Sequence, residues 1–76
     1  MIPLNFAKLG RKLKIVKIDA GKGLLNRLNH MGLLEGEVIK VLQNSQGPLI
    51  IAKGNMRLAL GRGMSHKILV EEIEDL

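Results

Sequence analysis

The chain has 76 residues, with 12 Lys or Arg against 7 Asp or Glu, and it contains no cysteine. This length corresponds to a single domain, near the lower limit for an ordinary hydrophobic core. The lack of cysteine excludes disulfides, thiolate zinc sites and thiol nucleophiles. No apolar run approaches the roughly 20 residues that a membrane-spanning helix needs, and the first residues lack a signal-peptide pattern. We therefore expect a soluble, cytoplasmic protein of one domain, residues 1–76.

The charge is unevenly distributed. Four of the seven acids lie in residues 71–75, so residues 1–70 contain twelve basic and three acidic groups, a net charge of +9. Such a surface favours an anionic partner. A solvated face that keeps a small domain soluble explains the same charge more simply.

Residues 1–10 contain Pro3, which cannot donate to a sheet, and they place Leu4, Phe6 and Leu9 at spacings that allow packing. We expect an irregular or short helical segment that covers one end of the core.

A strand is predicted from Arg11 to Ile18. Leu13 and Ile15 alternate with lysines, and then Val16 and Ile18 continue in the opposite phase. This change of phase predicts either a bulge near Ile15 or burial of both faces, and in either case strong curvature.

The stretch from Gly21 to Gly36 predicts an amphipathic helix that ends at Gly32. Its apolar side combines Leu24, Leu25, Leu28 and Met31, and its polar side carries Asn26, Asn29 and His30. Gly32 directly follows the last periodic residue, as a left-handed helix end requires, and Gly36 marks a second turn. Before the helix, Asp19 is the candidate to cap its free amides.

The remaining apolar runs predict four more strands, at residues 37–42, 49–53, 56–60 and 68–70. Gly54 and Asn55 predict a tight hairpin between the second and third of these, and on the strand after the turn Met56, Leu58 and Leu60 define the buried face. Residues 61–67 predict a break with one helical turn. The acidic tail, residues 71–76, has too little apolar content to be ordered by itself, apart from Ile73, which is a candidate to extend the last strand. The predicted fold is mainly β with short helices: a small, partly open barrel of about five strands, with one amphipathic helix after the first strand.

The residues offer little for catalysis or for a metal. Ser65 and His66 are neighbours, but adjacent residues on a helical turn point about 100° apart, so we expect two surface polar residues. His30, Glu35, Glu37 and the thioethers of Met31 and Met64 lack the spacing of a known ligand motif. We expect no enzyme, no resident metal and no cofactor.

Nucleic-acid binding is the main alternative, because Lys8, Arg11, Lys12, Lys14 and Lys17 gather near the first strand and small β-barrels often bind nucleic acids. Phe6 is the sole aromatic residue, so the bases would have almost nothing to stack on, and only backbone electrostatics would remain.

One series of residues resembles a known family over nearly the whole chain. Arg27-Leu28, Met31-Gly32-Leu33 and Gly36 are followed by Gly47-Pro48, Leu58-Ala59-Leu60 and Ile68-Leu69-Val70. In order and spacing they resemble the FeoA family of small ferrous iron transport proteins, whose usual opening Leu4, Leu9 and Gly10 also match. The Arg-Leu-x-x-Met-Gly-Leu-x-x-Gly segment is the most specific part.

The resemblance implies a Src-homology-3-like (SH3-like) barrel that acts as a cytosolic accessory to FeoB, the membrane ferrous iron transporter with a GTPase domain. On this interpretation the protein is neither transporter nor enzyme, and it binds FeoB and modulates its assembly or GTP-linked uptake. The same fold resembles the C-terminal, metal-sensing domain of iron- and manganese-dependent repressors, but no helix-turn-helix precedes it here.

We expect a partner to bind the outer side of the central helix. Arg27 lies beside Met31 at the border of the apolar stripe, so its stem could instead shield the core edge. The candidate partner-binding residues are Asn26, Arg27, Asn29 and His30, joined by Arg57 and Arg62 if the strand that carries Arg57 lies nearby.

Overall fold

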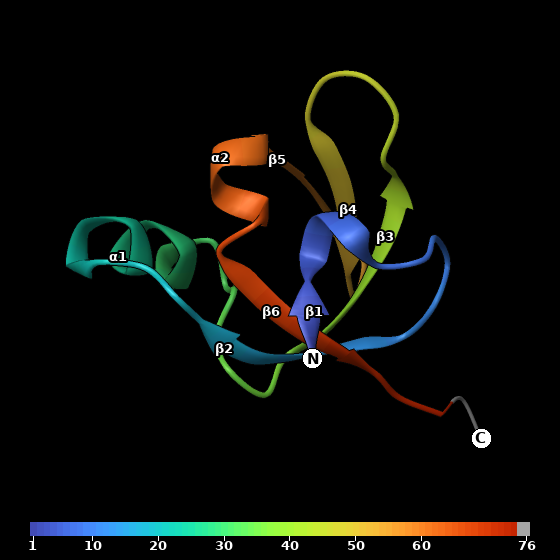
Figure 1. The fold of residues 1–76 in the computed structure, drawn as a ribbon, viewed down its shortest axis with the longest axis horizontal. Coiled ribbons are helices and arrows are strands. Elements are labelled where there is room, and N and C mark those ends of the chain that lie inside the picture. Colours follow the sequence, from blue (N-terminus) through green and yellow to red (C-terminus); the bar gives the residue numbers. More distant parts are fainter. Residues whose placement is uncertain (75–76) are drawn as a thin grey trace.

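Six antiparallel strands form one sheet in the computed structural model, which describes residues 1–74 (Figure 1). The spatial order is β1-β6-β2-β3-β4-β5. The strands are β1 (Ile2–Pro3), β2 (Leu13–Ile18), β3 (Val38–Gln43), β4 (Leu49–Lys53), β5 (Met56–Leu60) and β6 (Ile68–Glu72). A 3-10 helix, η1 (Leu4–Phe6), and two α-helices, α1 (Lys22–His30) and α2 (Arg62–Ser65), complete the described elements.

The predicted curvature of the first long strand is confirmed. In the pairing of β2 with β6 the register shifts between Ile15 and Lys17, where the apolar pattern changes phase. A bulge of this kind bends the strand and raises its twist. Both Ile15 and Ile18 therefore reach the same interior, at 0% and 7% exposure.

The helix prediction is also confirmed. α1 ends at His30, Met31 is its C-cap, and Gly32 follows with φ +85°. Leu28 is fully buried, while Leu24, Leu25 and Met31 are half-buried and pack against the core. The prediction that Asp19 caps the helix is wrong, because Gly21 occupies the N-cap position and no side chain bonds to the first amides. Asp19 is held at the end of β2, where its backbone amide donates to the carbonyl of Lys67 at 2.8 Å.

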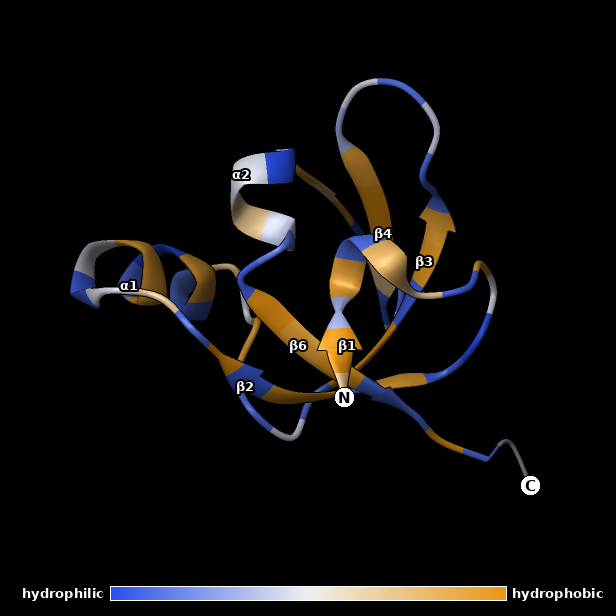
Figure 2. Cartoon of the chain, viewed as in Figure 1, coloured by the Kyte–Doolittle hydropathy of each residue, from blue (hydrophilic) through white to orange (hydrophobic). Residues whose placement is uncertain are grey.

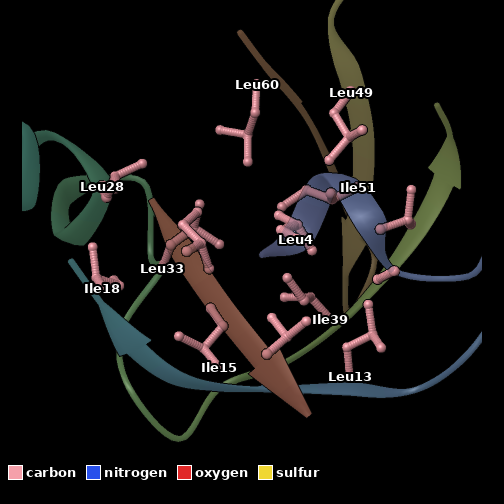
Figure 3. Packing of buried hydrophobic residues seen from close by; sticks show 14 residues of the cluster. Leu4, Leu13, Ile15, Ile18, Leu28, Leu33, Ile39, Leu49, Ile51 and Leu60 are labelled. Carbon is pink, nitrogen blue, oxygen red and sulfur yellow. The ribbon is translucent and has the colours of Figure 1, made fainter. Parts of the chain in front are cut away.

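A single core fills the inside of the curved sheet, to which η1 and α1 add Leu4 and Leu28. Figure 3 shows side chains from β2, β3, β4, β5, η1 and α1 pointing toward one another, and Figure 2 shows that β1, β4 and β6 are largely hydrophobic while the loop between β3 and β4 is not. The buried apolar residues are Leu4, Ala7, Leu13, Ile15, Ile18, Leu28, Leu33, Ile39, Val41, Leu49, Ile51, Leu60, Ile68 and Val70. All of them are aliphatic, so van der Waals packing of branched side chains stabilises this domain.

The first residues correct the predicted strand number and part of the predicted packing. Ile2 and Pro3 pair with Val70 and Leu69, which adds a short edge strand, a position where proline is tolerated. The predicted helical turn is present as η1, but only Leu4 points inward, since Phe6 is 72% and Leu9 is 55% exposed.

The hairpin of β4 and β5 has the predicted two-residue turn. Gly54 has φ +58° at the first turn position, where a type II′ turn places glycine. The alternation on β5 holds for Leu60, which is buried, but Met56 is 51% exposed because it flanks the turn at the end of the sheet.

Part of the acidic segment is ordered, contrary to the prediction. β6 continues to Glu72, with Glu71 opposite Lys14 and Glu72 opposite Leu13. The Arg11 guanidinium lies 2.9 Å from the Glu72 carboxylate. Opposite charges across neighbouring strands support this extension. The Ile73 amide donates to the carbonyl of Lys12, as its predicted role in extending the strand requires, and residues 75–76 lie outside the described part.

Within residues 1–74 no helix has the length and apolar character needed to cross a membrane.

Candidate functional site

The polar side of α1 is the first candidate surface. Asn26, Arg27 and His30 are exposed on it, and Leu28 on the opposite side is fully buried. The helix is amphipathic as the sequence predicts, and packing of its apolar side leaves these three side chains facing outward. Figure 1 places α1 at one end of the molecule, at the left.

Asn29 differs from the other predicted residues of this face. It is half-buried, because it follows Leu25 by one helical turn, and its Oδ1 atom is enclosed without a hydrogen-bond partner in residues 1–74. A buried acceptor without a donor costs about 1–3 kcal/mol. Asn29 therefore borders the packed side of α1 and contributes less accessible surface than expected.

The end of α1 is fixed by a contact that sequence patterns do not reveal. The Lys53 ammonium on β4 donates to the carbonyl of Gly32 at 2.7 Å and lies 3.6 Å from the Glu37 carboxylate. One lysine thus connects the tip of the hairpin to the C-terminal end of the helix and to the start of β3. This contact holds the exposed face of α1 in a fixed orientation relative to the sheet.

Arg57 and Arg62 lie on two other elements. Arg57 projects from the outer face of β5, opposite Ala52. The Arg62 guanidinium, at the start of α2, donates to the carbonyl of Ser45 in the loop between β3 and β4, which is at the top of Figure 1. The structure thus groups Asn26, Arg27 and His30 on one helix face and places the two arginines on separate elements.

The pair Ser65 and His66 does not form a Ser–His hydrogen bond among the described residues. Ser65 is fully buried, so the expectation of a surface serine is wrong, and its hydroxyl donates to the carbonyl of Arg62 at 3.3 Å. The exposed His66 places Nδ1 3.1 Å from the same carbonyl. Both side chains thus lie within hydrogen-bond distance of one backbone acceptor at the start of α2. Residues 1–74 also contain no group of three or more His, Cys, Asp or Glu side chains able to hold a metal ion.

A groove of about 350 Å³ lies on the outer side of the sheet, beside the hairpin of β4 and β5. Its walls come from the residue before β2, the start of β3 and the hairpin of β4 and β5. The lining residues are Lys12, Val38, Ile39, Lys40, Ala52 and Gly54. Alternation along β3 could predict that Lys40 faces outward, but its neighbours across the sheet follow only from the strand register.

Comparison with known proteins connects this fold to one family. The model of the FeoA domain matches residues 2–72. A protein of Methanocaldococcus jannaschii with the provisional name Fe(2+) transport protein A is 46% identical over 74 residues, which are 97% of this chain and 90% of that protein.

Solved structures show the same fold. A crystal structure of the iron uptake regulatory protein FeoA has a TM-score of 0.86 and 36% identity, over 95% of this chain and 96% of that one. FeoA of Stenotrophomonas maltophilia, crystallised with zinc and described as a prokaryotic SH3 domain protein, has a TM-score of 0.79 and 19% identity, over 93% and 91% of the two chains.

The manganese-activated repressor ScaR has a TM-score of 0.87 and 22% identity, over 95% of this chain but only 35% of its own, which shows a shared fold. The SH3-like barrel predicted from the sequence is therefore confirmed. Because the family model covers residues 2–72 and a relative is 46% identical over 97% of this chain, the chain belongs to the FeoA family of iron transport proteins.

Proposed function

We propose that this protein is a cytosolic accessory protein of ferrous iron uptake, which binds the FeoB transporter and modulates its GTP-linked transport. The observation that carries the proposal is the 46% identity to an Fe(2+) transport protein A over 97% of the chain. The relative from Stenotrophomonas maltophilia, which is described as a candidate ferrous iron transport activating factor, has the same fold and supports a regulatory role.

The proposed mode of action is binding, without catalysis. The polar face of α1 offers Arg27 as a charged anchor, with Asn26 and His30 beside it as hydrogen-bonding groups. Arginine is enriched in protein interfaces because its planar group binds carboxylates and stacks on other side chains. The contact between Lys53 and Gly32 supports this role, since a helix held in place loses less entropy on binding.

The test is a titration of isotope-labelled protein with the soluble GTPase domain of its own FeoB, followed by backbone amide shifts. We expect saturable shifts confined to Asn26, Arg27 and His30 and their neighbours on α1. Arg27→Glu should weaken binding at least about tenfold, by analogy with charged interface anchors. Lys17→Glu is the matched control, because Lys17 is exposed on β2. Equal affinity of Arg27→Glu and the unmodified protein would move the site away from α1, and no shifts anywhere would contradict binding to this domain.

The proposal includes no resident metal. A ligand present at 100 times its dissociation constant stabilises the folded state by about 2.7 kcal/mol. For a domain of this size that energy raises the melting temperature by roughly 10 °C or more. We therefore expect no such rise in melting temperature with saturating Fe²⁺ or Mn²⁺ under anaerobic conditions. A clear rise would show that the protein binds the metal, and direct metal sensing would then take the place of a metal-free role.

A further inference from the structure

We propose that the outer face of the sheet is a second interaction surface, which binds an acidic, extended peptide segment of a partner protein through Lys40 and Arg57. This surface lies on β3, β4 and β5 and is separate from the α1 face, so the two proposals can fail independently.

The strand register creates the surface. On β3, Ile39 and Val41 are 1% and 0% exposed, so Lys40 between them points to the outer face. Lys40 lies opposite Ala52 of β4, and Ala52 lies opposite Arg57 of β5. Residues directly opposite one another share a face of the sheet. The three residues therefore form a row across three strands, with a cation at each end and a small side chain between them.

Within the described part of the chain, neither cation has a protein partner. Among residues 1–74 no hydrogen bond or ion pair involves the Lys40 ammonium or the Arg57 guanidinium. The acid just before β3, Glu37, instead lies 3.6 Å from the ammonium of Lys53. The row thus presents two uncompensated positive charges.

An apolar hollow lies beside the row, at its Lys40 end. Val38 is 41% exposed and lines the groove of about 350 Å³ together with Ala52, Lys12 and Lys40. A groove of this size accommodates a few side chains. Aliphatic contact in the groove and charge contact along the neighbouring row favour a peptide with both kinds of residue.

The spacing of the cations specifies the peptide further. Neighbouring strands lie about 4.8 Å apart, so two steps separate the backbone at Lys40 and Arg57 by roughly 10 Å. A polyproline II chain rises about 3.1 Å per residue and returns to the same side every third residue, which spaces carboxylates about 9 Å apart. An acidic residue at every third position matches the row.

A nucleic acid fits this face less well. Phe6, the sole aromatic residue, is on η1, so the face has no ring on which a base could stack. Phosphate contacts alone would remain, with strong dependence on salt.

The probe is the acetylated and amidated peptide Glu-Pro-Ala-Glu-Pro-Ala-Glu, with the same peptide carrying Gln in place of Glu as its control. We expect saturable amide shifts centred on Val38, Lys40, Ala52 and Arg57 with the acidic peptide and none with its Gln version. Lys40→Glu combined with Arg57→Glu should weaken binding about tenfold or more, since both contacts become repulsive.

The matched control protein is Lys17→Glu combined with Lys22→Glu, which changes the net charge equally at exposed positions on β2 and α1. An equal loss of affinity in this control would overturn the proposal in favour of general attraction to a basic protein. Absent or scattered shifts with the acidic peptide would also overturn it, as would shifts at the row with an oligothymidylate alone. If the double Glu variant fails to fold, Lys40→Gln with Arg57→Gln provides the same comparison.

Discussion

Replacing Gly32 with alanine should destabilise the fold, because two features of the structure oppose a side chain there. Gly32 has φ +85°, and a Cβ atom built on it would lie 2.8 Å from the Lys53 ammonium nitrogen. The left-handed conformation costs an ordinary residue about 1–2 kcal/mol. The lysine end can move aside, but it then gives up its 2.7 Å hydrogen bond to the Gly32 carbonyl. The Lys53 side chain is 25% exposed, so we take about 1 kcal/mol for that loss, below the usual range for charged groups.

The expected total is about 2–3 kcal/mol, or roughly 10–20 °C in melting temperature for a domain of this size. Equilibrium urea denaturation monitored by circular dichroism measures this loss of stability. An m-value equal to that of the unmodified protein would show that the two proteins have comparable unfolded states.

Gly23→Ala is the matched control at the other end of α1. Gly23 has no positive φ, and a Cβ there would meet nothing within 4 Å, so the same change should stabilise the protein by about 0.5–1 kcal/mol. Lys53→Met removes the same hydrogen bond that Gly32→Ala disturbs, and the two changes combined should cost about 1 kcal/mol less than their sum. A Gly32→Ala protein as stable as the unmodified one, or effects of the same sign at both glycines, would refute this reasoning.

Three further substitutions probe the packing, the surface and the helix face. Leu28→Ala, at a side chain with 0% exposure, should cost about 2–5 kcal/mol in urea denaturation, and a cost below 1 kcal/mol would mean that α1 does not close the core. Arg11→Ala should cost at most about 0.5 kcal/mol, because its ion pair with Glu72 is 56% and 47% exposed; a larger loss would assign the acidic segment a real part in stability. Asn29→Leu should leave stability unchanged or raise it by about 1 kcal/mol, since it removes an enclosed acceptor without a partner, whereas a loss above 1 kcal/mol would show that Oδ1 is satisfied.

Local patterns were sufficient for most of the elements. The change of apolar phase at Ile15 predicted the bulge in β2, and Gly32 and Gly54 marked a helix end and a hairpin turn that only positive φ allows. These features depend on near neighbours in the chain, so the sequence alone could reveal them. The amphipathic face of α1 with exposed Asn26, Arg27 and His30 belongs to the same class.

Contacts between distant segments were predicted less well. The short strand at Ile2 and Pro3 exists because β6 offers it a free edge, and Glu71 and Glu72 are ordered because they pair with Lys14 and Leu13 of β2. Ser65 is buried although Gly63 and His66 are exposed, since α2 turns its side chain inward. For both strand pairings the deciding partner is far away in the sequence.

Composition and periodicity by themselves determined a small aliphatic β-barrel with one amphipathic helix, because burial of apolar side chains at fixed periods leaves few alternatives for so short a chain. The tertiary structure alone decided which charges meet. Strand register placed Lys40 and Arg57 on either side of Ala52, and the path of the hairpin brought Lys53 to Gly32. Electrostatic and hydrogen-bonded contacts act over a few ångströms in space, and that proximity is set by how the strands pair.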